Sequence, residues 1–340
     1  MIKEVIGRLV AGENLTEAES EAAMNEIMSG EATAAQIAAF MTALRVKGET
    51  AAELTGCARA MRRHATAVNT VHQEVLDTCG TGGDRSGTFN ISTAAAFVVA
   101  GAGVPVAKHG NRSVTSQSGS ADVLEALGVN IDLDAPQVSH CLDAIGIGFL
   151  FAPKLHPAMR HAVGPRRELG IRSIFNLLGP LTNPAGARYQ LLGVYAPELT
   201  ELVAETLLRL GTRRALVVHG AGMDEMTLAG PTKVTEVQEG GIRTYTVNPE
   251  EFGLALCPPE ALRGGTPAEN AALIAAVLRG EASPRRNVVL LNAAGALVAA
   301  GAADDLQEGF CQAAWSIDSG AAQAKLEALR TLTQEMKACS

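Results

Sequence analysis

The sequence of 340 residues has few aromatic side chains, 4 % of the total, and no long uncharged apolar stretch. A membrane-spanning helix requires roughly 18 or more such residues in a row, so the sequence predicts no membrane anchor. The first residues, MIKEVIGRLVAGENLT, lack the apolar segment and small-residue cleavage site of a secretory signal. Together these absences predict a cytoplasmic protein that does not bind membranes.

Basic side chains are also in deficit, because 28 Lys and Arg oppose 36 Asp and Glu and give a net charge of −8. Nonspecific binding of nucleic acid or of an anionic membrane depends on a dense positive field, so neither is expected and any phosphate site must be built locally. The cysteines show no CxxC or metal-site spacing, which predicts free thiols in a reducing compartment. They are Cys57, Cys79, Cys141, Cys257, Cys311 and Cys339.

Residues 1 to 70 are predicted to form a small all-helical domain. Three capping boxes mark helix starts, because a Thr is followed three residues later by Glu or Gln; the pairs are Thr16 with Glu19, Thr33 with Gln36, and Thr50 with Glu53. A unit this small has little interior of its own, so it should pack on the rest of the chain. It either supplies a dimer interface or serves as a helical cap without self-association.

From residue 71 onward, apolar strands alternate with helical patterns, as expected for a second domain of the α/β class spanning 71 to 340. With 47 % hydrophobic residues and few aromatics, the core must consist of Ala, Val, Leu and Ile, which suits helices on a parallel sheet. The predicted fold is a doubly wound domain with a mainly parallel central sheet, and the segment 170 to 180 returns to the helical domain. Strands are expected at 74–77, 104–107, 148–151, 189–194, 214–219 and 287–291, and helices at 200–210, 268–278 and 321–336.

A first Gly-rich turn follows the strand that ends near Asp77. Gly80, Thr81, Gly82, Gly83 and Asp84 form a loop whose glycines permit positive φ and close backbone approach to a ligand. The helix after it is predicted to begin at Asn90 or Ser92, so its free N–H groups face the loop. A single stretch of this kind is typical of a tight turn.

A second turn of the same kind follows the strand at 104–107. Its charge comes from Lys108 and Arg112, and its hydrogen-bond donors come from hydroxyl groups and from the N-terminus of the next helix. Two adjacent turns of this composition favour a ligand with several negative charges over a purely structural role. The second turn comprises Lys108, His109, Gly110, Asn111, Arg112, Ser113, Ser116, Ser118, Gly119 and Ser120.

Two adjacent carboxylates, Asp224 and Glu225, follow the strand at 214–219. Taken alone, such a pair is typical of a solvated loop. Beside two phosphate loops, it indicates a divalent cation bound between the acids and a phosphorylated ligand, because neighbouring carboxylates repel each other unless a positive charge lies between them.

At these positions the sequence resembles the anthranilate phosphoribosyltransferases. The matching strings are GTGGD from Gly80, TFNIST from Thr88, KHGNRSVTSQSGSADVLEALG from Lys108, GIRSIFNLLGPLTNP from Gly170, and GMDE from Gly222. The resemblance runs nearly from end to end and extends to the nucleoside-phosphorylase-like phosphoribosyltransferase fold. It implies transfer of 5-phosphoribose from 5-phosphoribosyl 1-pyrophosphate to the amine of anthranilate, the second step of tryptophan biosynthesis from chorismate.

The resemblance also implies which residues bind the phosphoribosyl donor and its metal. Ser92, Asp224 and Glu225 are the implied metal ligands, with two Mg²⁺ ions per monomer, and a homodimer through the helical domain is implied as well. The implied donor contacts are Gly80, Thr81, Gly83, Asp84, Thr88, Asn90, Ile91, Ser92, Thr93, Lys108, His109, Gly110, Asn111, Arg112, Ser113, Ser116 and Ser120.

For the acceptor, the resemblance implies contacts with anthranilate from Gly80, Asn111 and Arg166, with His109 and His156 lining the approach. Only one of Arg166 and Arg167 need face the site. An arylamine is neutral at pH 7, so no strong base must activate it, whereas the departing pyrophosphate needs charge stabilisation from Mg²⁺, Lys108 and helix N-termini. Lys108, His109 and Asn111 are the expected catalytic residues. His109 either accepts the amine proton or only orients the substrate.

Two other functions compete with this interpretation. A pyrimidine nucleoside phosphorylase-like enzyme would bind inorganic phosphate and a nucleoside, and the combination of GTGGD with the acidic pair argues against it. A non-enzymatic relative that binds nucleic acid would need a basic stripe, which an acidic chain lacks.

Overall fold

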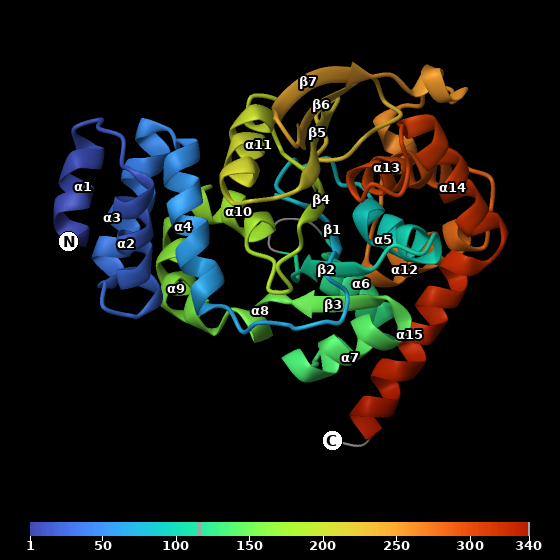
Figure 1. Ribbon diagram of the computed structural model, residues 1–340, viewed down its shortest axis with the longest axis horizontal. Coiled ribbons are helices and arrows are strands. Elements are labelled where there is room, and N and C mark those ends of the chain that lie inside the picture. The colour runs from blue at the N-terminus through green and yellow to red at the C-terminus, as the bar shows by residue number, and fades with distance from the viewer. Residues whose placement is uncertain (114–116, 339–340) are drawn as a thin grey trace.

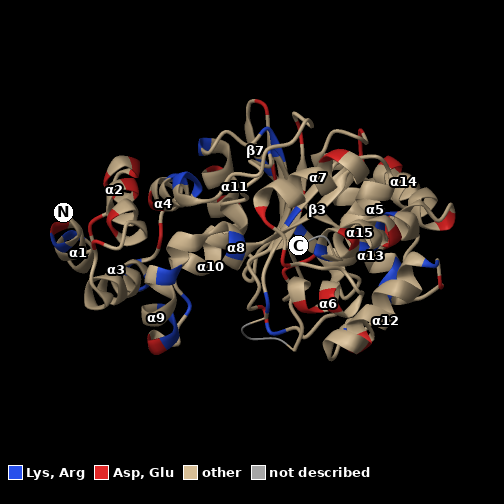
Figure 2. Ribbon diagram, turned by 90° about the horizontal axis from the view of Figure 1, so that it is seen from below, with Lys and Arg blue, Asp and Glu red and all other residues tan. Residues whose placement is uncertain are grey.

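The computed structural model describes residues 1–113 and 117–338. It has a helical lobe at the N-terminus and a larger α/β lobe built around one sheet (Figure 1). Ser116, one of the expected donor contacts, lies outside the described residues. Among the helices of the described part, none is long and apolar enough to cross a membrane. Acidic and basic residues are interspersed along the ribbons of both lobes (Figure 2).

The helical lobe consists of α1 (Ile2–Val10), α2 (Glu17–Met28), α3 (Ala34–Lys47) and α4 (Ala51–His64). All three predicted capping boxes are confirmed, with each threonine hydroxyl accepting a backbone N–H at 3.3 Å. Two later helices, α9 (Arg160–Leu169) and α10 (Ile174–Leu178), pack on α3 and α4. The segment after Leu169 therefore lies against the helical lobe although it belongs to the middle of the sequence.

The sheet has seven strands in the order β3-β2-β1-β4-β5-β6-β7. The first five in that order are parallel and the last two pairings are antiparallel, so the predicted mainly parallel, doubly wound α/β fold is confirmed. The strands are β1 (Leu76–Gly80), β2 (Val106–Gly110), β3 (Ile147–Phe151), β4 (Tyr189–Gly193), β5 (Arg214–Gly220), β6 (Thr232–Gln238) and β7 (Gly241–Val247).

Helices cover both faces of the sheet, because alternate residues of its buried strands point to opposite sides. Leu191 and Leu216 join one core with α5 (Ile91–Gly101) and α13 (Pro284–Ala299). Leu192 and Val217 join a second core with α11 (Leu199–Arg209) and the helical lobe. The remaining helices are α6 (Ser120–Ala126), α7 (Ala135–Ile145), α8 (Ala152–Leu155), α12 (Pro267–Leu278), α14 (Leu306–Asp318) and α15 (Ala321–Ala338).

The predicted strand at 287–291 is wrong, because these residues lie within α13. A short apolar run does not distinguish a buried strand from a helix that is buried all around. The start signal lay just upstream: Pro284 occupies the first helical turn and the Ser283 hydroxyl accepts the backbone N–H of Arg286 at 3.2 Å. Strands β6 and β7 were not predicted either, although Gly240 and Gly241 mark their tight turn.

The strand order places a topological switch point between β1 and β4. The chain passes from β1 to β2 and β3 on one side and then returns to β4 on the other side of β1. At this point Gly80 and Gly193, the last residues of β1 and β4, lie opposite each other. Open α/β sheets bind ligands in the crevice beyond the carboxyl ends of such strands. The fold therefore predicts a ligand site at the loops after Gly80 and Gly193.

Candidate functional site

Strand β1 ends at Gly80, three residues later than predicted, so the first Gly-rich loop begins at Thr81. Gly82 and Gly83 have φ of 64° and 79°, values that favour glycine. The N–H of Thr81 donates to the Gly193 carbonyl at 2.9 Å. The Gly82 N–H donates to a carboxylate oxygen of Asp224 at 2.7 Å. The loop is therefore tied to β4 and to the acidic pair at the switch point.

A partly buried cluster of carboxylates lies against this loop. The Asp224 backbone N–H donates to Asp84 Oδ2 at 3.2 Å, and the Ser92 N–H donates to Glu225 Oε1 at 3.3 Å. Burial raises the pKa of Asp224 to about 7, and the neighbouring Asp84 charge adds to this shift. Burial and the charge of Asp224 also raise the pKa of Glu225 well above its usual range. The structure therefore brings Ser92, Asp224 and Glu225 together, as the metal prediction requires.

These groups fit Mg²⁺ that is shared with a phosphorylated ligand. Within 1–113 and 117–338, no three His, Cys, Asp or Glu side chains converge as a preformed metal site. Mg²⁺ commonly binds through one or two carboxylates together with substrate phosphates and water, so a complete protein cage is not required. The raised pKa values reflect carboxylates that lack sufficient compensation, and a divalent cation would supply it.

Lys108 lies inside β2 and not in the loop after it, and its side chain reaches the same region. Its ammonium donates to the Thr78 carbonyl at 2.5 Å and to the Ser92 hydroxyl at 3.4 Å. Burial lowers its pKa, while the charges of Asp77 and Glu225 favour the protonated form. A cation held here beside the metal-binding side chains can stabilise charge that develops on a departing phosphate group.

Two buried polar residues of this region were missed by sequence reasoning. Asp77 of β1 accepts the backbone N–H of His109 at 3.1 Å and the side-chain amide of Asn183 at 2.8 Å. The same amide nitrogen donates to the Ala107 carbonyl at 2.8 Å. Burial raises the pKa of Asp77 to about 6, and Lys108 opposes this shift. The signal was an aspartate inside an apolar strand, but its partner is remote in sequence.

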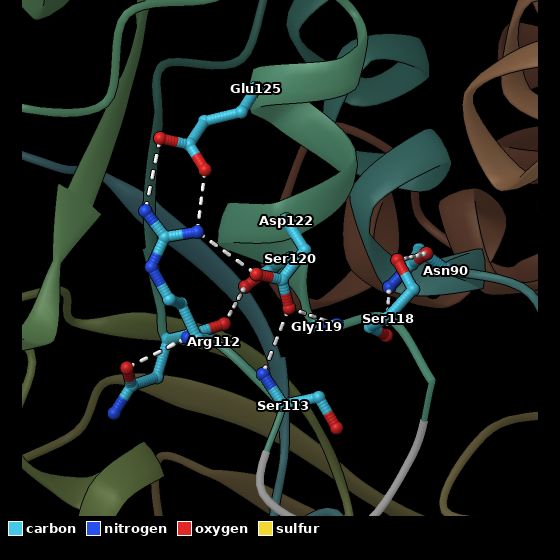
Figure 3. Close-up of polar contacts among 9 residues, drawn as sticks. Asn90, Arg112, Ser113, Ser118, Gly119, Ser120, Asp122 and Glu125 are labelled. Atoms are coloured by element: carbon cyan, nitrogen blue, oxygen red, sulfur yellow. Dashed lines mark hydrogen bonds and ion pairs between the residues drawn. The ribbon is translucent and has the colours of Figure 1, made fainter. Parts of the chain in front are cut away.

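The start of α5 faces the first loop, with Asn90 at the N-cap position. Its side-chain amide donates to the Ser118 carbonyl at 3.1 Å (Figure 3). Its amide oxygen accepts from Asn270 at 2.9 Å. The Thr93 hydroxyl is buried without a hydrogen-bond partner in the described chain. The amide of Asn90 therefore joins α5 to the second Gly-rich turn, while the first backbone N–H groups of the helix remain directed towards the loop and the acidic pair.

Arg112, an expected donor contact, is already paired within the second turn. Its guanidinium contacts Asp122 at 3.0 Å and Glu125 at 3.0 Å on α6 (Figure 3). The Asp122 carboxylate also accepts the backbone N–H groups of Ser113 at 3.0 Å and Gly119 at 2.8 Å. A role for Arg112 with the donor therefore requires it to exchange these carboxylates for phosphate.

His109 and His156 form a buried pair, with ring centroids 5.1 Å apart. One side of each ring hydrogen-bonds to backbone, at Gly179 and Thr182 respectively. The Nε2 atom of each has no partner in the described chain. Burial lowers the pKa of His109 to about 3, helped by His156, and lowers that of His156 to about 4. Both rings are neutral at pH 7, and a base this weak favours substrate orientation over proton abstraction.

Of the two candidate arginines on α9, Arg166 is half-buried and Arg167 is exposed. The Arg166 guanidinium lies over the Phe175 ring, 5.2 Å from its centroid, and burial lowers its pKa. No carboxylate of the described residues forms an ion pair with it. Arg166 therefore offers an uncompensated cation, as expected for a residue that receives a carboxylate.

The comparisons with known proteins agree with this geometry. A model of the glycosyl transferase family, a/b domain, matches residues 72–323, and a model of the helical bundle domain of the same family matches residues 3–65. The chain is 62 % identical to the anthranilate phosphoribosyltransferase of Moorella thermoacetica over 330 residues, which cover 97 % of each chain. The chain belongs to the anthranilate phosphoribosyltransferase family. The resemblance seen in the sequence is therefore confirmed.

Solved structures of this family have the same fold. The enzyme from Thermus thermophilus has a TM-score of 0.93 and 45 % identity over 97 % of this chain and 99 % of its own. The Saccharomyces cerevisiae enzyme in complex with PRPP and Mg has a TM-score of 0.88 and 29 % identity over 98 % of each chain. Another structure of the yeast enzyme, in complex with 4-fluoroanthranilate, also has a TM-score of 0.88.

The histidine pair predicts a pH dependence of stability. Because folding holds the pKa values near 3 and 4, below the usual 6.5, the unfolded chain binds protons that the folded chain does not. The contribution of this pair to the free energy of unfolding is then fully present above about pH 6.5. It decreases as the pH falls towards 4, by about 1.4 kcal/mol per pH unit for each ring. Asp77, with a raised pKa, contributes the opposite slope between its usual value and 6.

The measurement compares urea unfolding of the wild-type protein with that of His156→Gln from pH 4.5 to 7. The variant should lose about 1.4 kcal/mol less per pH unit than the wild type in this range, because glutamine does not titrate. Exposed His140 provides a matched control, and His140→Gln should keep the wild-type slope. Equal slopes for the wild type and His156→Gln would contradict the buried neutral pair.

Proposed function

We infer that the protein transfers 5-phosphoribose from 5-phosphoribosyl 1-pyrophosphate to the amine of anthranilate, giving N-(5-phosphoribosyl)anthranilate and pyrophosphate. It is a pentosyltransferase of tryptophan biosynthesis. The observation that carries this conclusion is the contact between the Gly-rich loop and the partly buried Asp224–Glu225 pair at the switch point of the sheet. A pyrophosphate with its metal fits a site that combines free backbone donors with desolvated carboxylates.

The mechanism follows from the charges in the site. Negative charge develops on the pyrophosphate as its bond to the ribose breaks, and Lys108 together with the N–H groups of the loop and of α5 stabilises it. Ser92, Asp224 and Glu225 would hold Mg²⁺, which would supply further charge neutralisation for the leaving group. The amine attacks as a neutral nucleophile, so His109 and Asn111 need only hold it in line with the anomeric carbon.

The metal content is supported by the yeast relatives, whose structures are described with PRPP and Mg and with Mg alone. We propose that two Mg²⁺ ions bind each monomer. Three carboxylates, those of Asp84, Asp224 and Glu225, adjoin one loop, and their combined charge exceeds that of a single divalent ion. We likewise propose that the expected donor contacts in both Gly-rich turns bind the sugar donor.

The function is tested by mixing the protein with anthranilate, the sugar donor and Mg²⁺. Anthranilate fluorescence should decay as product forms, and omission of the donor or addition of excess chelator should stop the decay. If fluorescence stays constant while the protein releases a nucleobase from a pyrimidine nucleoside and inorganic phosphate, the nucleoside phosphorylase alternative is correct and the transferase is excluded.

Arg166→Ala is expected to raise the KM for anthranilate by about 10- to 100-fold, because a charge-assisted hydrogen bond to a carboxylate is worth roughly 1.5–3 kcal/mol. The KM for the sugar donor should change less than about twofold. Steady-state kinetics with each substrate varied in turn at saturating Mg²⁺ measures both constants.

Arg167→Ala is the matched control, because Arg167 is exposed on the same helix. It should keep both Michaelis constants. If Arg166→Ala and Arg167→Ala raise the anthranilate KM equally, the loss reflects the general positive field of α9 and not a specific contact. Equal increases for donor and acceptor in Arg166→Ala would remove this residue from the acceptor site.

We also propose a homodimer formed through the helical domain of residues 1 to 70. Three large apolar side chains are exposed there, Met1 at 52 %, Val10 at 75 % and Val46 at 83 %, as an unpaired interface would present them. The monomer mass is 35.2 kDa. Light scattering of the wild type should give about twice this mass, and Val46→Asp should lower the measured mass. A monomeric wild type would leave the helical cap without self-association.

The cytoplasmic location stays a prediction, because it rests on composition.

A further inference from the structure

Arg172 joins the segment between α9 and α10 to the Gly-rich donor loop. Its guanidinium donates a hydrogen bond to the backbone carbonyl of Gly83. The same guanidinium lies over the ring of Tyr195, with 4.3 Å between its central carbon and the ring centroid. None of the roles assigned above uses this residue. Its contacts with the loop and with an aromatic ring indicate that Arg172 has a specific role.

The hydrogen bond to Gly83 fixes the direction of the next backbone donor. In a planar trans peptide, the carbonyl of one residue and the N–H of the next point in opposite directions. With the Gly83 carbonyl turned towards Arg172, the Asp84 N–H faces the other way. In the described chain the N–H groups of Gly83 and Asp84 have no backbone or side-chain acceptor. Two consecutive free donors of this kind form a concavity that receives an anion.

The loop needs such a tether because its own residues do not hold it rigid. Gly82 and Gly83 both have positive φ and lack side chains, so their backbone has more freedom to lose than any other residue. Two further ties exist upstream, from Thr81 to Gly193 and from Gly82 to Asp224. Downstream, the Asp84 carboxylate accepts the Asp224 N–H, and Arg172 alone of these ties holds the Gly83 carbonyl.

Tyr195 makes the tether stiff. Stacking on the ring restricts the guanidinium to one plane, and the Tyr195 backbone N–H donates to the Thr81 hydroxyl at 3.1 Å. The contacts thus close a ring that passes through the loop, Arg172, Tyr195 and back to the loop. Among the described residues no carboxylate forms an ion pair with Arg172, so its charge also adds to the positive potential at the loop.

We propose that Arg172 is a positioning residue of the donor site, which holds the Gly83–Asp84 peptide with the Asp84 N–H towards the pyrophosphate of the sugar donor. Tyr195 acts with it as a stacking platform. The proposal rests on the proposed transferase function, since it names the group that orients the donor. Arg172 acts through the loop, so its loss should weaken binding of the sugar donor and leave binding of anthranilate unchanged.

The test is steady-state kinetics of Arg172→Ala, Arg172→Lys, Tyr195→Phe and Tyr195→Ala with the full-length protein. Arg172→Ala should raise the KM for the sugar donor by about tenfold or more, because the lost hydrogen bond is charge-assisted, with the anthranilate KM within about twofold. Lysine keeps the charge but not the planar fork, so Arg172→Lys should recover only part of the donor affinity. Tyr195→Phe should match the wild type, and Tyr195→Ala should resemble Arg172→Ala.

Arg243 is a matched control, because it also stacks on a tyrosine, 5.2 Å from the Tyr245 ring centroid, at the far edge of the sheet. Arg243→Ala should leave both Michaelis constants unchanged. If the two residues act as a unit, the double variant Arg172→Ala with Tyr195→Ala should be no worse than either single variant.

Three results would overturn the proposal. The first is a wild-type donor KM in a folded Arg172→Ala. The second is a raised anthranilate KM alone, which would place Arg172 in the acceptor site. The third is a fall in melting temperature with equal loss in both constants, restored by Arg172→Lys, which indicates a role in stability only. A wild-type protein that does not transfer phosphoribose would instead reject the proposed function, independently of any variant.

Discussion

Replacing Gly193 by alanine is expected to reduce kcat/KM for phosphoribosyl transfer by about 1,000-fold or more, since misplacement by about 1 Å near reacting groups already accounts for about 100-fold. A Cβ atom at Gly193 would lie 1.6 Å from the backbone oxygen of Asp224 and 2.4 Å from its carbonyl carbon. Both neighbours are backbone, so no side-chain rotation relieves the clash. Either β4 or the loop that carries Asp224 must move.

The displacement would reach several groups at once. Gly193 lies opposite Gly80, and the Gly193 carbonyl accepts the N–H of Thr81. A Cβ atom at Gly80 would lie 2.7 Å from the Asp224 carboxylate. The acidic pair and the Gly-rich loop are therefore positioned by the same close backbone approach. Overpacking of this kind also destabilises a fold by about 1–3 kcal/mol, so the variant should unfold at lower urea concentration.

Gly7→Ala is the matched control, because a Cβ there meets nothing within 4 Å and Gly7 lies inside α1. Alanine favours a helix over glycine by about 1 kcal/mol, so this variant should be slightly more stable and fully active. Kinetics and urea unfolding of the two variants, measured side by side, decide the matter. A folded Gly193→Ala with kcat/KM within threefold of the wild type would show that the close approach does not shape the site.

Features that depend on neighbours in sequence could be predicted well. The capping boxes at Thr16, Thr33 and Thr50 need only a hydroxyl and a side chain three residues later, and all three form. The alternation of strands and helices predicted the parallel part of the sheet. Where burial decides between helix and strand, the sequence was ambiguous, and the run at 287–291 became a helix because it is enclosed on all sides.

The site shows the same division. The two Gly-rich turns are local patterns, and the sequence located both. The approach of Asp224 to Gly80 and Gly193 depends on how β5 aligns with β4, and the pairing of Asp77 with Asn183 depends on a loop that returns from the helical lobe. Arg172 likewise meets Gly83 only because α9 and α10 pack beside the sheet. Contacts of this range carry no local sequence signal.

The other large effect is expected at the acidic pair. Asp224→Asn should lower kcat/KM by about 100-fold or more at limiting Mg²⁺, because charge stabilisation by a metal is worth several kcal/mol. The variant should also need more Mg²⁺ for half-maximal rate. The carboxamide oxygen still can accept the Gly82 N–H, so the loop should keep its position. A titration of the rate against Mg²⁺, together with the number of ions bound, measures both effects.

Stability in the presence of a chelator separates loss of metal from loss of fold. Asp224 lies partly buried beside Asp84 and Glu225, and its desolvation together with the like charges disfavours its ionised form. Removing that charge should leave the unfolding midpoint unchanged or higher, while activity falls. Exposed Asp304→Asn, at a distance from the switch point, should alter neither. An unaltered Mg²⁺ titration in Asp224→Asn would remove this residue from the metal site, and a destabilised fold would show that the carboxylate serves structure first. Loss of activity without loss of stability, together with a raised Mg²⁺ requirement, is the result expected of a metal ligand, because loss of a structural carboxylate lowers both activity and stability.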